Sequence, residues 1–172
     1  MLVGLRLENI ALIESLELNF QRGFSVFTGE TGTGKSIFLD ALDALFAGNQ
    51  ARSSFRLLRD GTTKSQVEAR FLGNAAVDSW LKAEGFEIDD DEIVISREWR
   101  FNDNRWSNRC RLNGVVVNRE QVLSLRPLLI DLTVQGQAHQ LAKVGKQLSW
   151  LDQFGGDLLE TPRLKVKRNW KN

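Results

Sequence analysis

The sequence has one cysteine, one histidine and no long apolar run, and each scarcity excludes a class of function. Cys110 alone cannot form an internal disulfide, which fits a reducing compartment. His139 alone cannot build a histidine-rich metal site, and one cysteine with one histidine gives no catalytic-triad pattern. No run approaches the ~20 apolar residues of a membrane span, and the N-terminus lacks a signal peptide's apolar stretch. The sequence therefore predicts a cytoplasmic protein.

The 172 residues are 42% hydrophobic and 26% charged, which suits one globular domain with a sizeable core. The formal net charge is +1, but residues 162–172 hold five basic residues and no acid. The rest of the chain therefore carries −4, by subtraction of +5 from +1. A basic tail on a mildly acidic body can contact phosphate backbones, and the alternative is an ordinary solvated helix face.

The chain is organised around residues 29–36 (GETGTGKS), which match the phosphate-binding loop pattern G-x-x-x-x-G-K-[ST]. Glycine lets such a loop turn its backbone N–H groups toward the phosphates. Lys35 can then reach the β- and γ-phosphates, and the Ser36 hydroxyl can ligate Mg²⁺. The other positions of this predicted nucleotide site are Gly29, Glu30, Thr31, Gly32, Thr33 and Gly34.

The residues on either side of the loop fit the strand–loop–helix context that the motif requires. Residues 24–28 (FSVFT) predict a short apolar strand before it. After it, Phe38, Leu42 and Leu45 fall on one helical face, and Phe46 extends this face. The N-terminus of this helix should favour anions. The context therefore indicates nucleotide binding.

Hydrophobic periodicity and turn signals predict further elements along the chain. The expected strands are an opening hairpin (residues 3–7 and 16–20), residues 67–71, residues 93–99, a hairpin around Asn113-Gly114, and residues 128–132. The expected helices are residues 75–83, a short helix that ends at Leu125 before Pro127, and a helix from Leu141. Asn118, with Gln121 three residues later, predicts a capping box at the start of the short helix.

Five arginines in this sheet region form a candidate nucleic-acid face. They are Arg97, Arg100, Arg105, Arg109 and Arg111, interleaved with Trp99 and Trp106. Arginine with exposed aromatic rings suits nucleic acid, whereas the alternative puts the tryptophans in the core. Additional candidates for phosphate contact are Arg52, Arg56 and Arg59. The acidic run at residues 89–92 is interpreted as a solvated turn rather than a metal site.

Several stretches in order resemble the N-terminal part of the RecN family of bacterial DNA repair ATPases, in the SMC-like branch of the ABC ATPases. They are the opening hairpin, the loop with residues 37–42 (IFLDAL), residues 58–61 (LRDG), residues 67–71, Arg109 ahead of Leu112-Asn113-Gly114, Ile130-Asp131, and residues 151–154 (LDQF). The loop alone is generic, but the ordered set is specific. The resemblance covers about residues 1–156, nearly the whole chain.

The resemblance implies an α/β P-loop NTPase fold, namely the N-terminal lobe of an ABC/SMC-type ATPase head with an added antiparallel β subdomain. Residues 1–156 would form this lobe, and residues 157–172 a basic tail that starts a coiled coil. The implied cofactors are ATP and Mg²⁺. Gln135 is the implied Q-loop glutamine, which would join Ser36 at the metal, and Gln137 is a weaker match. The chain departs from the family at Thr133-Val134, where histidine and glycine are usual, and mildly at Thr33.

The resemblance also implies DNA as the partner of the complete family protein, in double-strand-break repair and recombination. Family members carry a signature loop, a Walker B Asp-Glu pair and a switch histidine in a second lobe, and none of these occurs in this sequence. Leu132 follows Asp131 where the catalytic glutamate would stand. We therefore expect half of a head, which binds nucleotide, is not hydrolytic alone, and pairs with the missing lobe or a second head.

Two other interpretations stay open. The first is a self-contained, kinase-like P-loop enzyme in which Asp131 orders Mg²⁺. The early hairpin, and the lack of arginine-rich lid segments late in the chain, argue against it. The second is a non-catalytic interaction module that keeps the fold without the chemistry.

Overall fold

A computed structural model describes residues 1–30, 34, 36–46, 58–87, 91–102 and 105–132, all within one structural unit, Met1–Leu132. The elements in chain order are β1 (Leu2–Ile10), β2 (Ile13–Asn19), α1 (Ile37–Leu45), β3 (Lys64–Leu72), α3 (Ala75–Ala83), β4 (Glu92–Asn102), β5 (Arg105–Leu112), β6 (Val115–Val117) and α4 (Arg119–Leu129). The predicted boundary at residue 156, the helix from Leu141 and the basic tail lie outside the described residues.

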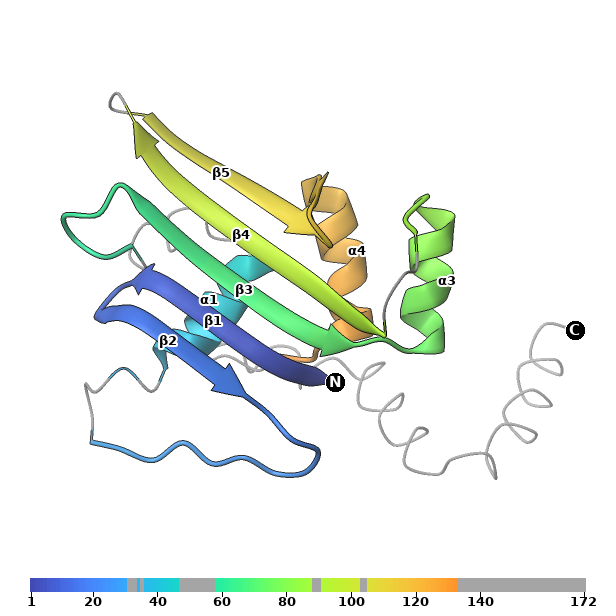
Figure 1. The fold of residues 1–172 in the computed structure, drawn as a ribbon, viewed down its shortest axis with the longest axis horizontal. Coiled ribbons are helices and arrows are strands. Elements are labelled where there is room, and N and C mark those ends of the chain that lie inside the picture. Colours follow the sequence, from blue (N-terminus) through green and yellow to red (C-terminus); the bar gives the residue numbers. More distant parts are fainter. Residues whose placement is uncertain (31–33, 35, 47–57, 88–90, 103–104, 133–172) are drawn as a thin grey trace, which may run out of the picture. The chain divides into compact units, whose positions relative to one another are not determined.

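The strands form one six-stranded sheet in the order β2-β1-β3-β4-β5-β6, and each neighbouring pair is antiparallel (Figure 1). Because side chains alternate along a strand, the register sorts them into two faces. Leu7 pairs with Val67, and both are fully buried on the face that we call inner. Their neighbours Arg6 and Glu68 pair on the opposite, outer face. The sheet is therefore apolar on one side and polar on the other.

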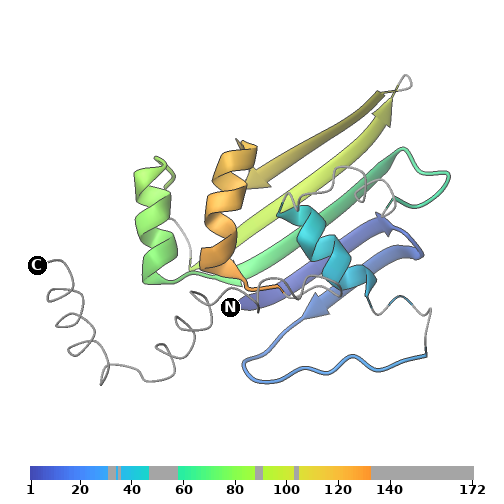
Figure 2. The same cartoon turned by 180° about the vertical axis from the view of Figure 1, so that it is seen from behind.

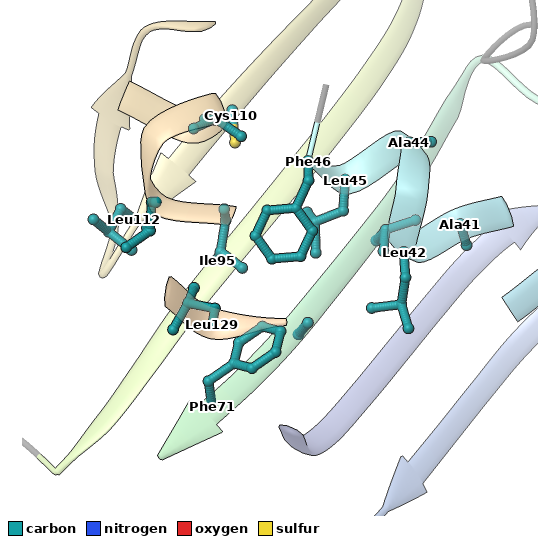
Figure 3. Packing of buried hydrophobic residues seen from close by; sticks show 14 of the residues in the cluster. Ala41, Leu42, Ala44, Leu45, Phe46, Phe71, Ile95, Cys110, Leu112 and Leu129 are labelled. Atoms are coloured by element: carbon teal, nitrogen blue, oxygen red, sulfur yellow. The ribbon is translucent and has the colours of Figure 1, made fainter. Parts of the chain in front are cut away.

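Helices α1 and α4 both lie against the inner face, as the two opposite views show (Figures 1 and 2). Figure 3 shows the side chains of α1 pointing into the layer between this helix and the strands. The rings of Phe46 and Phe71 meet edge to face there, with centroids 5.8 Å apart, and both side chains are fully buried. Full burial of each large apolar side chain contributes about 1.5–3 kcal/mol, so this layer holds α1 on the sheet.

Local signals fixed the turn and the helix start that join β5, β6 and α4. Asn113 and Gly114 both have positive φ, 46° and 82°, as a two-residue type I′ hairpin turn requires. The Gln121 backbone N–H donates to the Asn118 side-chain oxygen at 2.9 Å, and the Asn118 N–H donates to the Gln121 side chain at 3.0 Å. The predicted hairpin and capping box are confirmed, as are the opening hairpin and the strands and helix between residues 64 and 102.

The prediction of a strand at residues 24–28 is wrong in this structure. These residues belong to none of the described strands, and the side chains of Phe24 and Val26 are 92% and 63% exposed. Phe27 packs against Phe20 and Phe38 but is still 41% exposed. A strand needs a neighbour to satisfy its backbone groups, and among the described residues none pairs with this segment. The apolar pattern is present without a partner strand.

The prediction of a strand at residues 128–132 is also wrong, because α4 continues through Pro127 to Leu129. Proline lacks an N–H and disfavours a helix interior. At this position it removes one hydrogen bond of the helix, the bond to the carbonyl oxygen of Leu123. Val122, Leu125 and Leu129 are all buried at helical spacing, so continuing the helix carries Leu129 into the core. Burial of this face outweighs the local signal of the proline.

Substitution of Phe24 and of Phe46 tests whether residues 24–28 are exposed while Phe46 is packed in the core. Phe24→Ala should change the free energy of unfolding by less than about 0.5 kcal/mol, because the ring is exposed. Phe46→Ala should lower it by about 3–5 kcal/mol, since it leaves a cavity under α1. Urea unfolding of both variants measures the difference. Equal losses would show that residues 24–28 are packed as firmly as the core.

Candidate nucleotide site

The loop at residues 29–36 lies just before α1, as the sequence predicted. The structure describes four of its eight residues, Gly29, Glu30, Gly34 and Ser36. Gly29, Glu30 and Ser36 are exposed, and Gly34 is half-buried. Thr31, Gly32, Thr33 and Lys35 lie outside the described residues, and so does Gln135. The geometry of the site is therefore built from the end of the loop and the helix that follows.

Gly34 occupies a backbone conformation that side chains rarely adopt, with φ at +89°. Its carbonyl oxygen accepts a hydrogen bond from the Ile37 N–H at 3.0 Å. A Cβ at this position would also come within 3.1 Å of the Ile37 side chain. Glycine is therefore needed here for the chain to turn from the loop into α1.

Ser36 is the N-cap residue of α1, and its carbonyl oxygen accepts a bond from the Asp40 N–H at 3.0 Å. Serine at this position usually caps the helix through its hydroxyl. Ser36 makes no such side-chain bond, and its side chain is exposed. The hydroxyl thus sits at the positive end of the helix dipole without being used for capping. A hydroxyl in this state fits the role of a Mg²⁺ ligand.

Arg97 on β4 anchors the other end of α1. It lies on the inner face, where its Nη1 donates to the Ala44 carbonyl oxygen at 2.8 Å and its Nη2 to Asn108 Oδ1 at 2.8 Å. The guanidinium also lies over the ring of Trp99, 5.6 Å from the centroid. Burial lowers the pKa of Arg97, but the charge is retained beside the negative end of the helix dipole. Arg97 thereby fixes α1, and with it the end of the loop.

A second polar contact joins α1 to α4. Arg126 Nη2 lies 2.8 Å from Asp43 Oδ1, and both side chains are 20% exposed. One turn earlier, burial and the neighbouring Asp43 raise the pKa of Asp40. The helix that follows the loop is therefore held by apolar packing, by Arg97 and by Arg126. Sequence reasoning did not assign these positioning roles, although strand alternation puts Arg97 on the side of Ile95 and Trp99.

The arginines of the predicted basic face lie on two opposite faces of the sheet. Arg97 and the buried Trp99 are on the inner face, so the core interpretation holds for Trp99. Arg100 is on the outer face, with its Nε 2.6 Å from Glu98 Oε1. The register places Arg105, Arg109 and Arg111 on that face as well. The five arginines therefore do not form one surface.

Other candidate residues are tied to structure or lie elsewhere. Arg59 Nη1 donates to the Leu12 carbonyl oxygen at 3.1 Å, which holds it at the first hairpin, while Arg52 and Arg56 are outside the described residues. Asp131 is exposed after α4 rather than at the end of a strand. Burial raises the pKa of Cys110 to about 11, so its thiol stays protonated.

Within the described part of the chain, no three histidine, cysteine or acidic side chains gather in a way that could hold a metal ion. None of the helices described here has the length and apolar character that a membrane crossing requires.

Comparison with known proteins agrees with this fold. A family model described as an AAA domain matches residues 4–151. The DNA repair protein RecN of Synechocystis sp. is 41% identical over 172 residues, which cover 99% of this chain and 29% of that protein. RecN of Vibrio cholerae is 37% identical, with 99% and 30% covered, and RecN of Bacillus subtilis 34% identical, with 94% and 27% covered. The chain spans about 30% of the length of these curated relatives.

Among solved structures, the recombination mediator protein RecF-ATPrS in the RecFOR pathway matches with a TM-score of 0.52 and 19% identity, covering 72% of this chain and 29% of that chain. At this identity the likeness shows the fold alone. The fold is the one that the sequence predicted, the N-terminal lobe of an SMC/ABC-type P-loop fold. The chain belongs to the AAA domain family, and it is similar to RecN over nearly its whole length.

Two arginines on β4 test how α1 is held. Arg97→Met should lower the free energy of unfolding by about 1–3 kcal/mol, because two charged hydrogen bonds are lost while desolvation is relieved. Arg100→Met, the control, should cost less than about 1 kcal/mol, since its partner Glu98 is contacted at the surface. Urea unfolding gives the energies, and amide exchange should quicken in α1 for Arg97→Met only. Unchanged exchange in α1 would refute the anchoring role of Arg97.

Proposed function

We propose that this chain is the nucleotide-binding half of a RecN-like ATPase head that acts in DNA double-strand-break repair and recombination. The observation that carries it is the end of the phosphate loop, where Gly34 makes a glycine-specific turn into α1 and Ser36 leaves its hydroxyl out of the helix cap. In this role residues 29–36 bind the phosphates of ATP, and Lys35 neutralises their charge. Ser36 and Gln135 would hold Mg²⁺.

Mg²⁺ would supply charge neutralisation at the β- and γ-phosphates. The residues of this chain would position the nucleotide. Helix α1 presents its N-terminal N–H groups to the phosphates, and its packing on the sheet keeps the helix axis in a fixed direction. The proteins that the sequence resembles carry the Walker B Asp-Glu pair in a second lobe. We therefore propose that binding occurs in this lobe and that hydrolysis requires groups from a second lobe.

The exposed segment at residues 24–28 supports the need for a second lobe. An extended apolar stretch that precedes a phosphate loop is ordinarily paired, yet Phe24 is 92% exposed. Exposed apolar side chains on a strand-like segment are typical of a surface that another element covers. We propose that the partner of this segment is the C-terminal head lobe, supplied together with this one or by a second polypeptide.

The kinase-like alternative loses its main support. It required Asp131 at the end of a buried strand, from where a carboxylate can order Mg²⁺ beside the loop. Asp131 instead follows α4 and is exposed. The interaction-module alternative differs only in predicting no nucleotide binding, so a direct binding measurement separates it.

Lys35→Ala should abolish binding of Mg·ATP, because the lysine contributes charge at the phosphates and little to the core. Lys82→Ala, an exposed lysine on α3, is the matched control and should bind as the parent does. Titration calorimetry measures binding, and phosphate release measures turnover, which should be absent in the parent. Equal ATP affinity for Lys35→Ala and the parent would exclude the loop as the site.

Turnover that disappears in Lys35→Ala would instead show a catalytically complete enzyme. Absence of any nucleotide binding by the parent would favour the interaction module. Ser36→Ala should weaken binding in the presence of Mg²⁺ more than in its absence, because its hydroxyl is proposed to contact the metal.

A further inference from the structure

The outer face of the sheet is uncovered by the helices described here, since α1 and α4 both lie on the other side (Figures 1 and 2). Its charges are uneven. On β1 and β3, the outward acids and bases are interspersed, and Arg6 pairs with Glu8 at 2.6 Å. On β5, the outward positions carry Arg105, Arg109 and Arg111, which we call the β5 arginine row. No acid lies on that strand.

Among the described residues, the acid across the strand pair from this row already has two partners. Glu98 lies directly across the strand pair from Arg109. Its carboxylate is 2.6 Å from Arg100 Nε and 3.1 Å from Lys64 Nζ. The hydrogen bond from Arg100, with further help from Lys64, lowers the pKa of Glu98 to about 2. Three cations thus surround one carboxylate, and the surface there keeps an excess of positive charge.

The β5 arginine row itself has no ion pair among the described residues, and Arg105 and Arg109 are exposed. Alternate residues of a strand are about 6.8 Å apart, so the row spreads cations along about 20 Å of the sheet. A guanidinium binds phosphate oxygens in a planar, two-pronged way, which makes arginine well suited to phosphodiester groups. The chemistry that complements this row is a linear array of phosphates.

We infer that the β5 arginine row binds the sugar–phosphate backbone of nucleic acid. This deepens the proposed function, on which it rests for the choice of nucleic acid among polyanions. Trp99 is buried on the inner face and cannot stack on bases. Contacts between guanidinium groups and phosphates carry no base information, so binding through the row is independent of base sequence.

The test uses the whole 172-residue chain and a fluorescent DNA duplex of arbitrary sequence, titrated at several salt concentrations. The variant replaces Arg105, Arg109 and Arg111 with serine. The slope of log K against log salt should become shallower by about 2.7, or 0.9 per phosphate contact, and affinity at low salt should fall by about tenfold or more. Arg22, Lys82 and Arg119, exposed residues elsewhere, are changed to serine in the control, which alters net charge equally.

An unchanged slope in the β5 variant, an equal loss in the control variant, or no DNA binding by the parent would each overturn the assignment. A further contradicting result would be that polyglutamate binds the parent as tightly as DNA does and that the β5 variant loses this binding. The row would then recognise acidic protein. Calorimetry with Mg·ATP on the β5 variant separates the two proposals. Unchanged ATP binding beside weakened DNA binding supports the row, whereas a parent that binds DNA but no ATP contradicts the nucleotide site alone.

Discussion

Helix α1 is clamped to the inner face of the sheet, and the direction in which α1 leaves the loop at residues 29–36 depends on this clamp. Leu42, Leu45 and Phe46 are buried against the strands, and Arg97 donates to the carbonyl oxygen of Ala44 in the last turn. A loop that presents backbone N–H groups to phosphates needs the following helix to point in a fixed direction. The sheet supplies that direction through side chains far from the loop. The antiparallel sheet thereby supports the proposed nucleotide site through α1.

Strand alternation gives the two faces of β4 and β5 different tasks. Arg97 faces inward and fixes α1. Arg100, three residues further along the strand, faces outward and forms an ion pair with Glu98. An arginine on the inner face can be kept only because its charge meets a helix carbonyl, an amide oxygen and the ring of Trp99. The outward arginines remain solvated and have no such constraint. Arginines that are close together in the sequence therefore have unrelated structural surroundings.

Much of the fold follows from local sequence, and the failures have a shared cause. The Asn113-Gly114 turn, the Asn118 capping box and the alternation of β3 are short-range features, and each is confirmed. The strand expected at Phe24 was wrong because a strand depends on a neighbour that no local pattern reveals. The strand expected at Leu128 was wrong because burial of Leu125 and Leu129 carries the helix past Pro127. The loop was identified by its motif, whereas the anchoring by Arg97 required knowing which strands lie under α1.

The exposed segment at Phe24 and the clamped helix α1 give the two sides of the loop at residues 29–36 different surroundings. The loop has a rigid support on its C-terminal side, through α1, but its N-terminal side is preceded by residues without a strand partner in the described structure. In the proposed function, a strand of a second lobe pairs with residues 24–28 and gives them the neighbour that their apolar pattern indicates.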